Sequence, residues 1–306
     1  MTLAWLRAPI VVLCLLLAAC AEPGTDCDLV RITQAPLSVS HRLLTVPVEI
    51  NGRRVAMLVD TGAERTMVTE ETAERLKMTR DTRFVTSSGG VGGVTQSADA
   101  RVGSFVLGDF AVPIDRVSVN RLGPGVPFEG ILGADILLAS DLDIDVPGGA
   151  LSLYRTRSCI ADDPPWPDRA VPILGVTARR NRMMVPIEVN GVEGTALLDT
   201  GAQTSTLSAS FARRLGLTDQ VLASGQPLTI RGVGPGTLQA RMHRFRTVRL
   251  GPVVGTNVLL PVMPMDIGFG DALIGQDFLH GRRMWVSFPT RRLFISQHGH
   301  EMLLRP

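Results

Sequence analysis

The chain has 306 residues, of which 45% are hydrophobic, 20% are charged and only 5% are aromatic. This composition is that of a globular protein and excludes a collagen-like, coiled-coil or disordered chain, while the length favours two domains or one large one. The net charge of +2, from 31 basic and 29 acidic residues, gives no electrostatic basis for a nucleic-acid partner.

The first residues of the chain predict an export signal. Arg7 precedes an apolar run from Ala8 to Ala19, which is too short to span a bilayer and suits the core of a signal peptide. The run ends in Leu17-Ala18-Ala19-Cys20, which resembles the lipobox of bacterial lipoproteins. The resemblance implies cleavage before Cys20 and lipidation of that cysteine. An ordinary signal peptide with a small-residue cleavage site is the alternative.

This reading predicts where the protein resides. We expect residues 1–19 to be a lipoprotein signal peptide and residues 20–39 to form a tether and an N-terminal strand. The protein would then be lipid-anchored to a membrane on the periplasmic side of a bacterial envelope. Ala21, and not Asp, follows the lipidated cysteine, so nothing argues for retention at the inner membrane and the outer membrane is favoured.

Cysteine chemistry depends on the same leader. Of the four cysteines, Cys14 leaves with the signal peptide and Cys20 carries the lipid, so Cys27 and Cys159 remain. Disulfides persist in an oxidising compartment, and in the chain-entropy model a bond closing this loop stabilises by about 4–5 kcal/mol. We expect a disulfide between them, with two unrelated free thiols as the alternative.

The remainder of the chain consists of one pattern repeated twice. The segment Val46–Gly52 (VPVEING) returns as Val185–Gly191 (VPIEVNG), and Met57–Ala63 (MLVDTGA) returns as Ala196–Ala202 (ALLDTGA). Both segments are displaced by 139 positions, as Asp60 and Asp199 show. We therefore expect two equivalent lobes.

Later motifs return in the same order. Gly90-Val91-Gly92 matches Gly232-Val233-Gly234, and Ile131-Leu132-Gly133 matches Leu273-Ile274-Gly275, both displaced by 142 positions. The boundaries that follow are a first lobe at 40–158, a Pro-rich linker at 159–170 and a second lobe at 171–306. The alternative is a duplicated β-lobe that repeats its turns without any chemistry.

Each lobe reads as mostly β-structure. Residues Leu43 to Ile50 alternate in polarity and reach a turn at Asn51-Gly52, after which Val55 to Val59 returns as a second strand. A short helix should follow with Thr69 as its N-cap, and its counterpart should have Ser208 as N-cap and end at Gly216. Short apolar runs broken by Gly and Pro predict strands elsewhere and few short helices.

The repeated Asp-Thr-Gly-Ala carries the chemistry. Asp60 and Asp199 each follow an apolar strand and enter a tight turn. If equivalent lobes pack about a twofold axis, two carboxyl groups share one site and cannot both ionise easily. The ionised one can then act as a general base on water while the protonated one acts as an acid.

These loops resemble the active-site loops of retropepsin-type aspartic proteases, and the likeness covers nearly all of both lobes. It implies a mainly β fold in which two tandem retropepsin-like β-barrel lobes form a pseudo-twofold, bilobal, pepsin-like architecture. The implied catalytic residues are Asp60 and Asp199. The implied supporting residues are Thr61, Gly62, Ala63, Thr200, Gly201 and Ala202; the implied flap and substrate-binding residues are Gly90, Val91, Gly92, Gly232, Val233 and Gly234; and the loops beneath the site are Ile131, Leu132, Gly133, Leu273, Ile274 and Gly275.

The chain departs from the resembled families in three places. The only tyrosine, Tyr154, lies in a late strand, so the flap tyrosine of pepsins is missing. Ala134 and Gln276 stand where retroviral enzymes usually have an arginine, so the salt bridge that this arginine makes should be absent. Pro235 should make the second flap stiffer than the first.

The function expected from this reading is aspartic endopeptidase activity on a protein or peptide substrate, exerted by a monomer in a regulatory cleavage. No cofactor and no metal is expected, because His41, His243, His280, His298 and His300 are dispersed. The alternatives are a catalytically inert peptide-binding lipoprotein and an envelope scaffold on the same fold. The arginines at 241, 244, 246 and 249 are expected to form a solvated strand face and not a nucleic-acid site.

Overall fold

The computed structural model describes residues 28–122, 125–157, 163–167, 169–234, 236–264 and 270–296. The expected signal peptide, Cys20, Cys27, Cys159 and Pro235 lie outside these ranges, so lipidation, the disulfide and the stiffer second flap stay predictions. The expected domain boundaries at 159–170 likewise stay predictions. Among the described residues, no helix has both the length and the apolar character needed to cross a bilayer.

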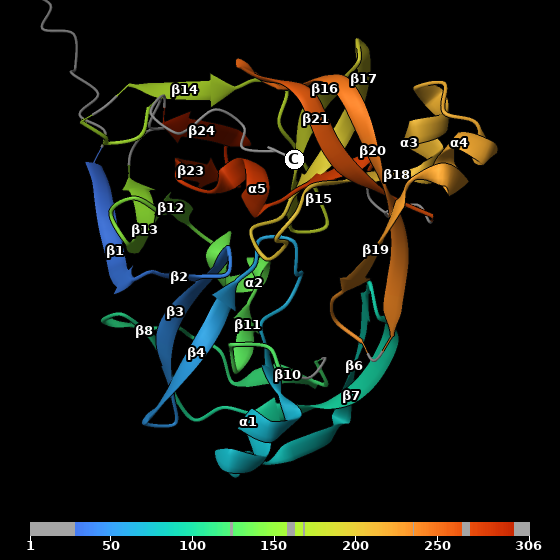
Figure 1. Cartoon of the computed structure of the whole chain (residues 1–306). Coiled ribbons are helices and arrows are strands. Elements are labelled where there is room, and N and C mark those ends of the chain that lie inside the picture. The colour runs from blue at the N-terminus through green and yellow to red at the C-terminus, as the bar shows by residue number, and fades with distance from the viewer. Residues whose placement is uncertain are drawn as a thin grey trace, which may run out of the picture.

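The first half of the chain folds mainly into one twisted sheet (Figure 1). Its path runs in the order β6-β7-β10-β5-β11-β4-β3-β8-β9, with β2 paired to β3. The elements of this half are β2 (Ser38–Ser40), β3 (Leu43–Ile50), β4 (Arg53–Val59), β5 (Met67–Thr69), α1 (Glu70–Arg75), β6 (Arg80–Gly90), β7 (Gly93–Arg101), β8 (Phe105–Leu107), β9 (Phe110–Ala111), β10 (Arg116–Asn120), β11 (Gly130–Leu132) and α2 (Ala134–Leu137).

The second half repeats this plan with longer hairpins. Its sheet runs β15-β16-β17-β22-β18-β21-β20-β19. The elements are β15 (Thr177–Arg179), β16 (Arg182–Val189), β17 (Val192–Leu198), β18 (Thr206–Ser208), α3 (Ala209–Arg214), α4 (Asp219–Ser224), β19 (Gln226–Arg231), β20 (Thr237–Leu250), β21 (Val253–Met263), β22 (Ala272–Ile274) and α5 (Gln276–Leu279).

A third sheet joins the two halves. Its order is β1-β13-β12-β23-β24-β14, from β1 (Asp28–Pro36), β12 (Asp141–Asp145), β13 (Ala150–Arg157), β14 (Ala170–Ile173), β23 (Arg283–Ser287) and β24 (Arg292–Ser296). At its centre β12 pairs antiparallel with β23, and Asp143 lies opposite Trp285. These two positions are equivalent in the repeat, so the pseudo-twofold axis passes between them.

An ion pair crosses this junction. Arg283 donates from Nε and from one terminal nitrogen to the carboxylate of Asp143, at 2.9 and 2.6 Å. Asp143 is only 1% exposed, so this bidentate pair is held in a buried place at the seam. The apolar core is also continuous across the seam, because the main buried cluster contains residues of both halves.

The mainly β architecture with few short helices is confirmed. The strand at Leu43–Ile50 has the predicted bounds, and Thr69 caps α1 by accepting a hydrogen bond from the N–H of Thr72 at 3.1 Å. Ser208 caps α3 in the same way through the N–H of Phe211. The arginines at 241, 244, 246 and 249 are all exposed on β20. They do not form one strand face as expected, because alternation along the regular ladder with β21 places 241 and 249 on one side and 244 and 246 on the other. Helix α4, which begins after the cap residue Thr218, was not anticipated.

The register of β1 and β13 sharpens the disulfide prediction. Asp28 lies opposite Arg157 at the end of this antiparallel ladder. Cys27 directly precedes Asp28 and Cys159 follows Arg157 by two residues, so each cysteine is within two residues of one strand pair. We expect non-reducing peptide mapping of protein from an oxidising compartment to find a peptide linking Cys27 and Cys159. Free thiols at both positions would contradict this prediction, and Cys27→Ser is the control that must release Cys159.

Candidate active site

The two aspartates leave the ends of buried central strands. Asp60 follows β4 and Asp199 follows β17. The last three residues of each of these two strands are buried. Each strand pairs in parallel with the strand of the apolar-apolar-Gly motif, β4 with β11 and β17 with β22. The N–H of Asp60 donates to Leu132 O and that of Asp199 to Ile274 O, both at 3.0 Å. The loops expected beneath the site therefore support it directly.

Each carboxylate is fixed by its own tight turn. Oδ1 of Asp60 accepts the N–H groups of Gly62 and Ala63, both at 2.9 Å. Oδ1 of Asp199 accepts those of Gly201 and Ala202, at 2.9 and 3.1 Å. Thus one oxygen of each carboxyl group is held by the backbone and the other is left for chemistry.

The turns of the two lobes touch at the pseudo-twofold axis. A Cβ atom at Gly62 would lie 2.5 Å from Cγ of Asp199, and one at Gly201 would lie 2.4 Å from Cγ of Asp60. Only glycine permits such an approach, which brings the two carboxyl groups within hydrogen-bonding reach of each other.

Two threonines lock the turns across the lobes. The hydroxyl of Thr61 donates to Leu198 O and that of Thr200 to Val59 O, both at 2.8 Å. Each hydroxyl also accepts the backbone N–H of the other threonine, at 3.1 and 3.2 Å. Both threonines are fully buried. Their four hydrogen bonds tie the orientation of one aspartate to that of the other.

The electrostatics of the pair are those of two acids in one site. Burial raises the pKa of Asp60, while the backbone N–H groups of its turn and the charge of Arg182 oppose that rise. Burial and the negative charge of Asp60 together raise the pKa of Asp199 well above its ordinary value of 3.8. Both side chains remain partly exposed, so water reaches them. The pair can hold one proton between them over a wide range of pH.

Two hairpins from opposite lobes meet at their tips (Figure 1). The first is β6–β7, turning at Gly90–Gly93, and the second is β19–β20. The N–H of Gly92 donates to Val233 O and that of Gly236 to Gly92 O, both at 2.9 Å. Val233 also packs against a buried apolar cluster of the first lobe that includes Leu58 and Ile131, and Ala63 of the catalytic turn packs against the same cluster. The expected flap residues are thus brought together over the first lobe.

The contact between the tips leaves no room for a side chain at Gly92. A Cβ atom there would lie 2.5 Å from the carbonyl oxygen of Gly234. If the hairpins close over a substrate, Gly92→Ala should lower kcat/KM by about tenfold to a hundredfold, because small displacements at a site are costly. Gly89→Ala is the matched control on the same hairpin, since a Cβ atom at Gly89 would meet nothing within 4 Å. Equal kinetics of the two variants would contradict a closing role.

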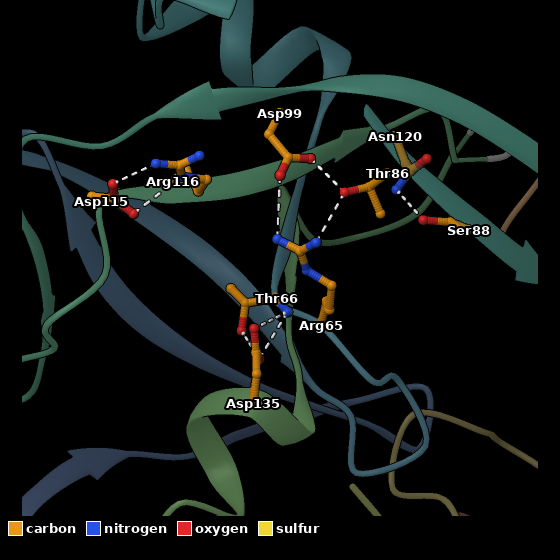
Figure 2. Close-up of polar contacts among 9 residues, drawn as sticks. All are labelled: Arg65, Thr66, Thr86, Ser88, Asp99, Asp115, Arg116, Asn120 and Asp135. Atoms are coloured by element: carbon orange, nitrogen blue, oxygen red, sulfur yellow. Dashed lines mark hydrogen bonds and ion pairs between the residues drawn. The ribbon is translucent and has the colours of Figure 1, made fainter. Parts of the chain in front are cut away.

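A polar network links the first hairpin to Arg65, which follows the catalytic turn by two residues, and Figure 2 shows its contacts. Arg65 donates to Thr86 Oγ1 at 3.1 Å and to the buried carboxylate of Asp99 at 3.2 Å. Thr86 also donates to Asp99 at 2.6 Å. The amide of Asn120 donates to Ser88 Oγ at 3.0 Å.

The second hairpin has a different lining. The positions equivalent to Thr86 and Ser88 are Leu228 and Ile230, and Ile230 packs on an apolar cluster that includes Met263. Ser88 therefore has a polar partner where Ile230 has an apolar one, and Leu228, in the place of Thr86, is exposed.

Several residues of the site were missed by the sequence reasoning. Asp135 accepts the N–H and hydroxyl of Thr66, and Asp277 accepts those of Ser205 in the same way. Both carboxylates recur at the 142-residue displacement, so the repeat itself contained the signal. Gln276 donates to Thr200 O at 2.8 Å, which ties it to the catalytic turn without an arginine.

The described histidines, His41, His243 and His280, lie far apart in the sequence and on different elements. His243 lies on β20 and contacts Leu222 O. Within the described ranges, no group of three or more His, Cys, Asp and Glu side chains is arranged to hold a metal ion. Tyr154 packs against Trp285, with ring centroids 5.1 Å apart, in the sheet that joins the halves.

Comparison with known families matches both halves of the chain. Residues 46–136 match the family described as “Aspartyl protease”, and residues 185–281 match the one described as “gag-polyprotein putative aspartyl protease”. Each match contains one of the two Asp-Thr-Gly-Ala turns.

Curated relatives share part of this likeness. The UBA domain-containing protein Mud1 of Schizosaccharomyces pombe is 33% identical over 119 residues, which are 37% of this chain and 33% of that protein. DNA damage-inducible protein 1 of Cryptococcus neoformans is 30% identical over 135 residues, 42% of this chain and 29% of that protein. The chain thus matches about a third of the length of these relatives.

A solved structure shares the whole architecture. The crystal structure of the aspartic proteinase from Irpex lacteus aligns with a TM-score of 0.52 and covers 89% of this chain and 99% of that one. The identity is 15%, so the likeness is one of fold. The bilobal arrangement about a pseudo-twofold axis is common to both.

Proposed function

We propose that this chain, which carries two retropepsin-like aspartyl protease domains in tandem, is an aspartic endopeptidase that cleaves peptide bonds of a protein substrate. The observation that carries the proposal is the pair of carboxyl groups held at the pseudo-twofold axis by the hydrogen bonds of Thr61 and Thr200 across the lobes, which we call the threonine lock. Neither aspartate is replaced, and each has one oxygen free of backbone contacts.

The reaction follows from the shared proton. The ionised carboxylate takes a proton from a water molecule, whose oxygen attacks the carbonyl carbon of the scissile amide, while the protonated carboxyl group donates to the carbonyl oxygen. The carboxyl group that received the proton of water then passes it to the amide nitrogen, while the other carboxylate takes a proton from a hydroxyl of the tetrahedral intermediate. The C–N bond breaks and an amine and a carboxylic acid are released. The two aspartates then return to their starting state with one shared proton.

The test is proteolysis by the purified chain. Casein or a peptide library, incubated from acid to neutral pH, should yield fragments, and a hydroxyl-bearing transition-state mimic should inhibit their release. The variant with both Asp60→Asn and Asp199→Asn is the control for a contaminating protease. Peptides that bind but remain intact would instead indicate an inert peptide-binding protein, and absence of both binding and cleavage would leave a scaffold.

We further propose that the protein acts in a bacterial envelope, anchored through lipid on Cys20, and cleaves a neighbouring envelope protein in a regulatory step. The N-terminal sequence supports this location. Because one chain supplies both aspartates, the proposed active form is a monomer. Fatty-acid labelling of cells should mark the protein and should fail with Cys20→Ser, and sedimentation should place activity in the monomer peak.

A further inference from the structure

The first catalytic turn is held from the opposite lobe by a charged side chain. Arg182, at the start of β16, donates from Nε to the carbonyl oxygen of Gly62 at 2.8 Å. A terminal nitrogen of the same guanidinium lies 2.8 Å from Oε1 of Glu64. An ion pair therefore closes on the turn that carries Asp60.

The second catalytic turn has a neutral counterpart. In the repeat, Leu43 corresponds to Arg182 and Gln203 corresponds to Glu64. Gln203 donates from its amide to the carbonyl oxygen of His41 at 2.7 Å. The two turns are thus alike in their backbone and their threonines, and they differ in charge.

Burial makes the charge of Arg182 effective. Its side chain is only 10% exposed, whereas that of Glu64 is 39% exposed. An arginine stays protonated even where burial opposes its charge, and a charge in a place of low dielectric acts more strongly than one in water. The guanidinium therefore supplies a fixed positive charge beside Gly62, two residues after Asp60.

We propose that the Arg182–Glu64 pair makes the two aspartates unequal, so that Asp60 is the ionised general base and Asp199 holds the proton and acts as the acid. This inference rests on the proposed function and deepens it. Arg182 is a positioning residue, because it acts through the turn and does not touch the substrate.

The direction of the electrostatics agrees with this assignment. The backbone N–H groups of the turn, the hydrogen bond with Asp199 and then the positive charge of Arg182 oppose the rise in the pKa of Asp60. The negative charge of Asp60 adds to the rise in the pKa of Asp199. Arg182 attracts both carboxylates, Asp60 more strongly than Asp199, so its charge favours ionisation of Asp60. In the reaction, Asp60 then takes the proton of the attacking water and Asp199 gives its proton to the carbonyl oxygen of the substrate.

Other charged groups near the site do not account for the difference. Asp135 and Asp277 lie beneath the two turns in equivalent places, each accepting hydrogen bonds from a hydroxyl residue of its own lobe. Arg180 acts on Arg182 itself, and Arg42 acts on Asp277. Among the charged groups of the described residues, the Arg182–Glu64 pair is what separates the first turn from the second. The other difference is neutral: Gln276 donates to Thr200 O of the second turn, where the first lobe has Ala134.

The test is the pH dependence of kcat/KM for a peptide substrate. Arg182→Leu, which installs the residue of the first lobe, removes the positive charge and should move the acid limb of the profile to higher pH. Arg182→Lys keeps the charge and should move it less. Glu64→Gln removes the negative partner, leaves Arg182 uncompensated and should move the acid limb to lower pH.

The opposite signs separate this role from a structural one. If the pair only holds the lobes together, both variants lower kcat/KM without moving the acid limb, and that result overturns the proposal. Arg53→Gln is the matched control, because it removes the same charge at the far end of β4 from Asp60 and should leave the profile unchanged. Glu64 is partly exposed, so Glu64→Gln keeps the test available if Arg182→Leu does not fold.

A second readout distinguishes failure of this inference from failure of the proposed function. If the wild-type chain cleaves no peptide, the carboxyl carbons of ¹³C-labelled aspartate are titrated by NMR in Asp199→Asn protein, with the Asp60 signal identified by its loss in the double variant. Adding Arg182→Leu should raise the pH at the midpoint of the Asp60 titration, and adding Glu64→Gln should lower that pH. Unchanged midpoints would refute the assignment whether or not the chain is a protease.

Discussion

Replacing Asp199 by Asn should lower peptide hydrolysis by about 10²–10⁴-fold, the usual contribution of general acid–base catalysis, while the melting temperature rises. Activity falls because an amide cannot supply the proton that the carbonyl oxygen needs. Stability rises because the variant removes one of two acids that share a single site. Loss of function and gain of stability then have one cause, the cost of holding two carboxyl groups together.

The sign of the pH dependence follows from the raised pKa of Asp199. At a pH below the ordinary pKa of 3.8, Asp199 is protonated in both the folded and the unfolded chain, so its raised pKa does not lower the free energy of unfolding. As the pH rises above that value, the unfolded chain ionises first, so the free energy of unfolding falls until the folded pKa has been passed. The stabilisation by Asp199→Asn should therefore be absent at strongly acid pH and should grow towards neutral pH.

Melting curves of the wild type and the variant across this range provide the measurement. Asp277→Asn is the informative control, since burial also raises the pKa of Asp277. Both oxygens of Asp277 accept hydrogen bonds from Ser205, whereas the backbone bonds of Asp199 use only Oδ1, which an asparagine keeps. The Asp277→Asn variant should lower the melting temperature. A fall in the melting temperature with Asp199→Asn at neutral pH would contradict the view of a strained acid pair.

The repeat explains why so much of the site was predictable. A displacement shared by Asp60 and Asp199 implies equivalent places in equivalent lobes, and a twofold arrangement then brings them together without any knowledge of distances. The same logic applied to Asp135 and Asp277 would have found the carboxylates beneath the turns. The internal repeat thus predicts which residues lie close together in the folded chain, but only for residues that occur in both lobes.

Residues that differ between the two lobes could not be predicted from the repeat. Arg182 corresponds to Leu43, so a search for recurring residues passes over it, and nothing near it in the sequence shows that it reaches the opposite lobe. The sheet that joins the halves is hidden for a similar reason. Its central pairing of β12 with β23 joins strands about 140 residues apart, and strand sequences specify which face is buried but not which partner is chosen.

The lining of the two hairpins is an intermediate case. Thr86 and Leu228 are visibly different in the sequence, yet their facing depends on the register of each hairpin. The difference became interpretable only when Arg65 was found to contact Thr86 and Asp99. Local patterns therefore located the flaps but did not distinguish their supports.

Removing one hydroxyl of the threonine lock should have the second large effect. Thr61→Val keeps the shape of the side chain but leaves the buried N–H of Thr200 and the carbonyl of Leu198 without their partner. Each unsatisfied buried group costs about 1–3 kcal/mol, so for the two groups we expect a loss of about 2–6 kcal/mol in the free energy of unfolding. The rate of hydrolysis should also fall by about tenfold to a hundredfold, because the hydrogen bonds that fix the orientation of one aspartate relative to the other are lost.

Thr61→Ser separates the hydroxyl from the methyl group, since it keeps the hydrogen bonds and should cost only about 0.8 kcal/mol for the lost methyl. By the repeat, Thr200→Val should reproduce Thr61→Val, because it removes the bond to Val59 and leaves the N–H of Thr61 unpaired. The double variant should then lose less than the sum of the two, as the first change already loosens the contact between the lobes. Denaturant unfolding gives these free energies, and a fully additive result would mean that each threonine stabilises its own lobe and that the turns are not coupled through them.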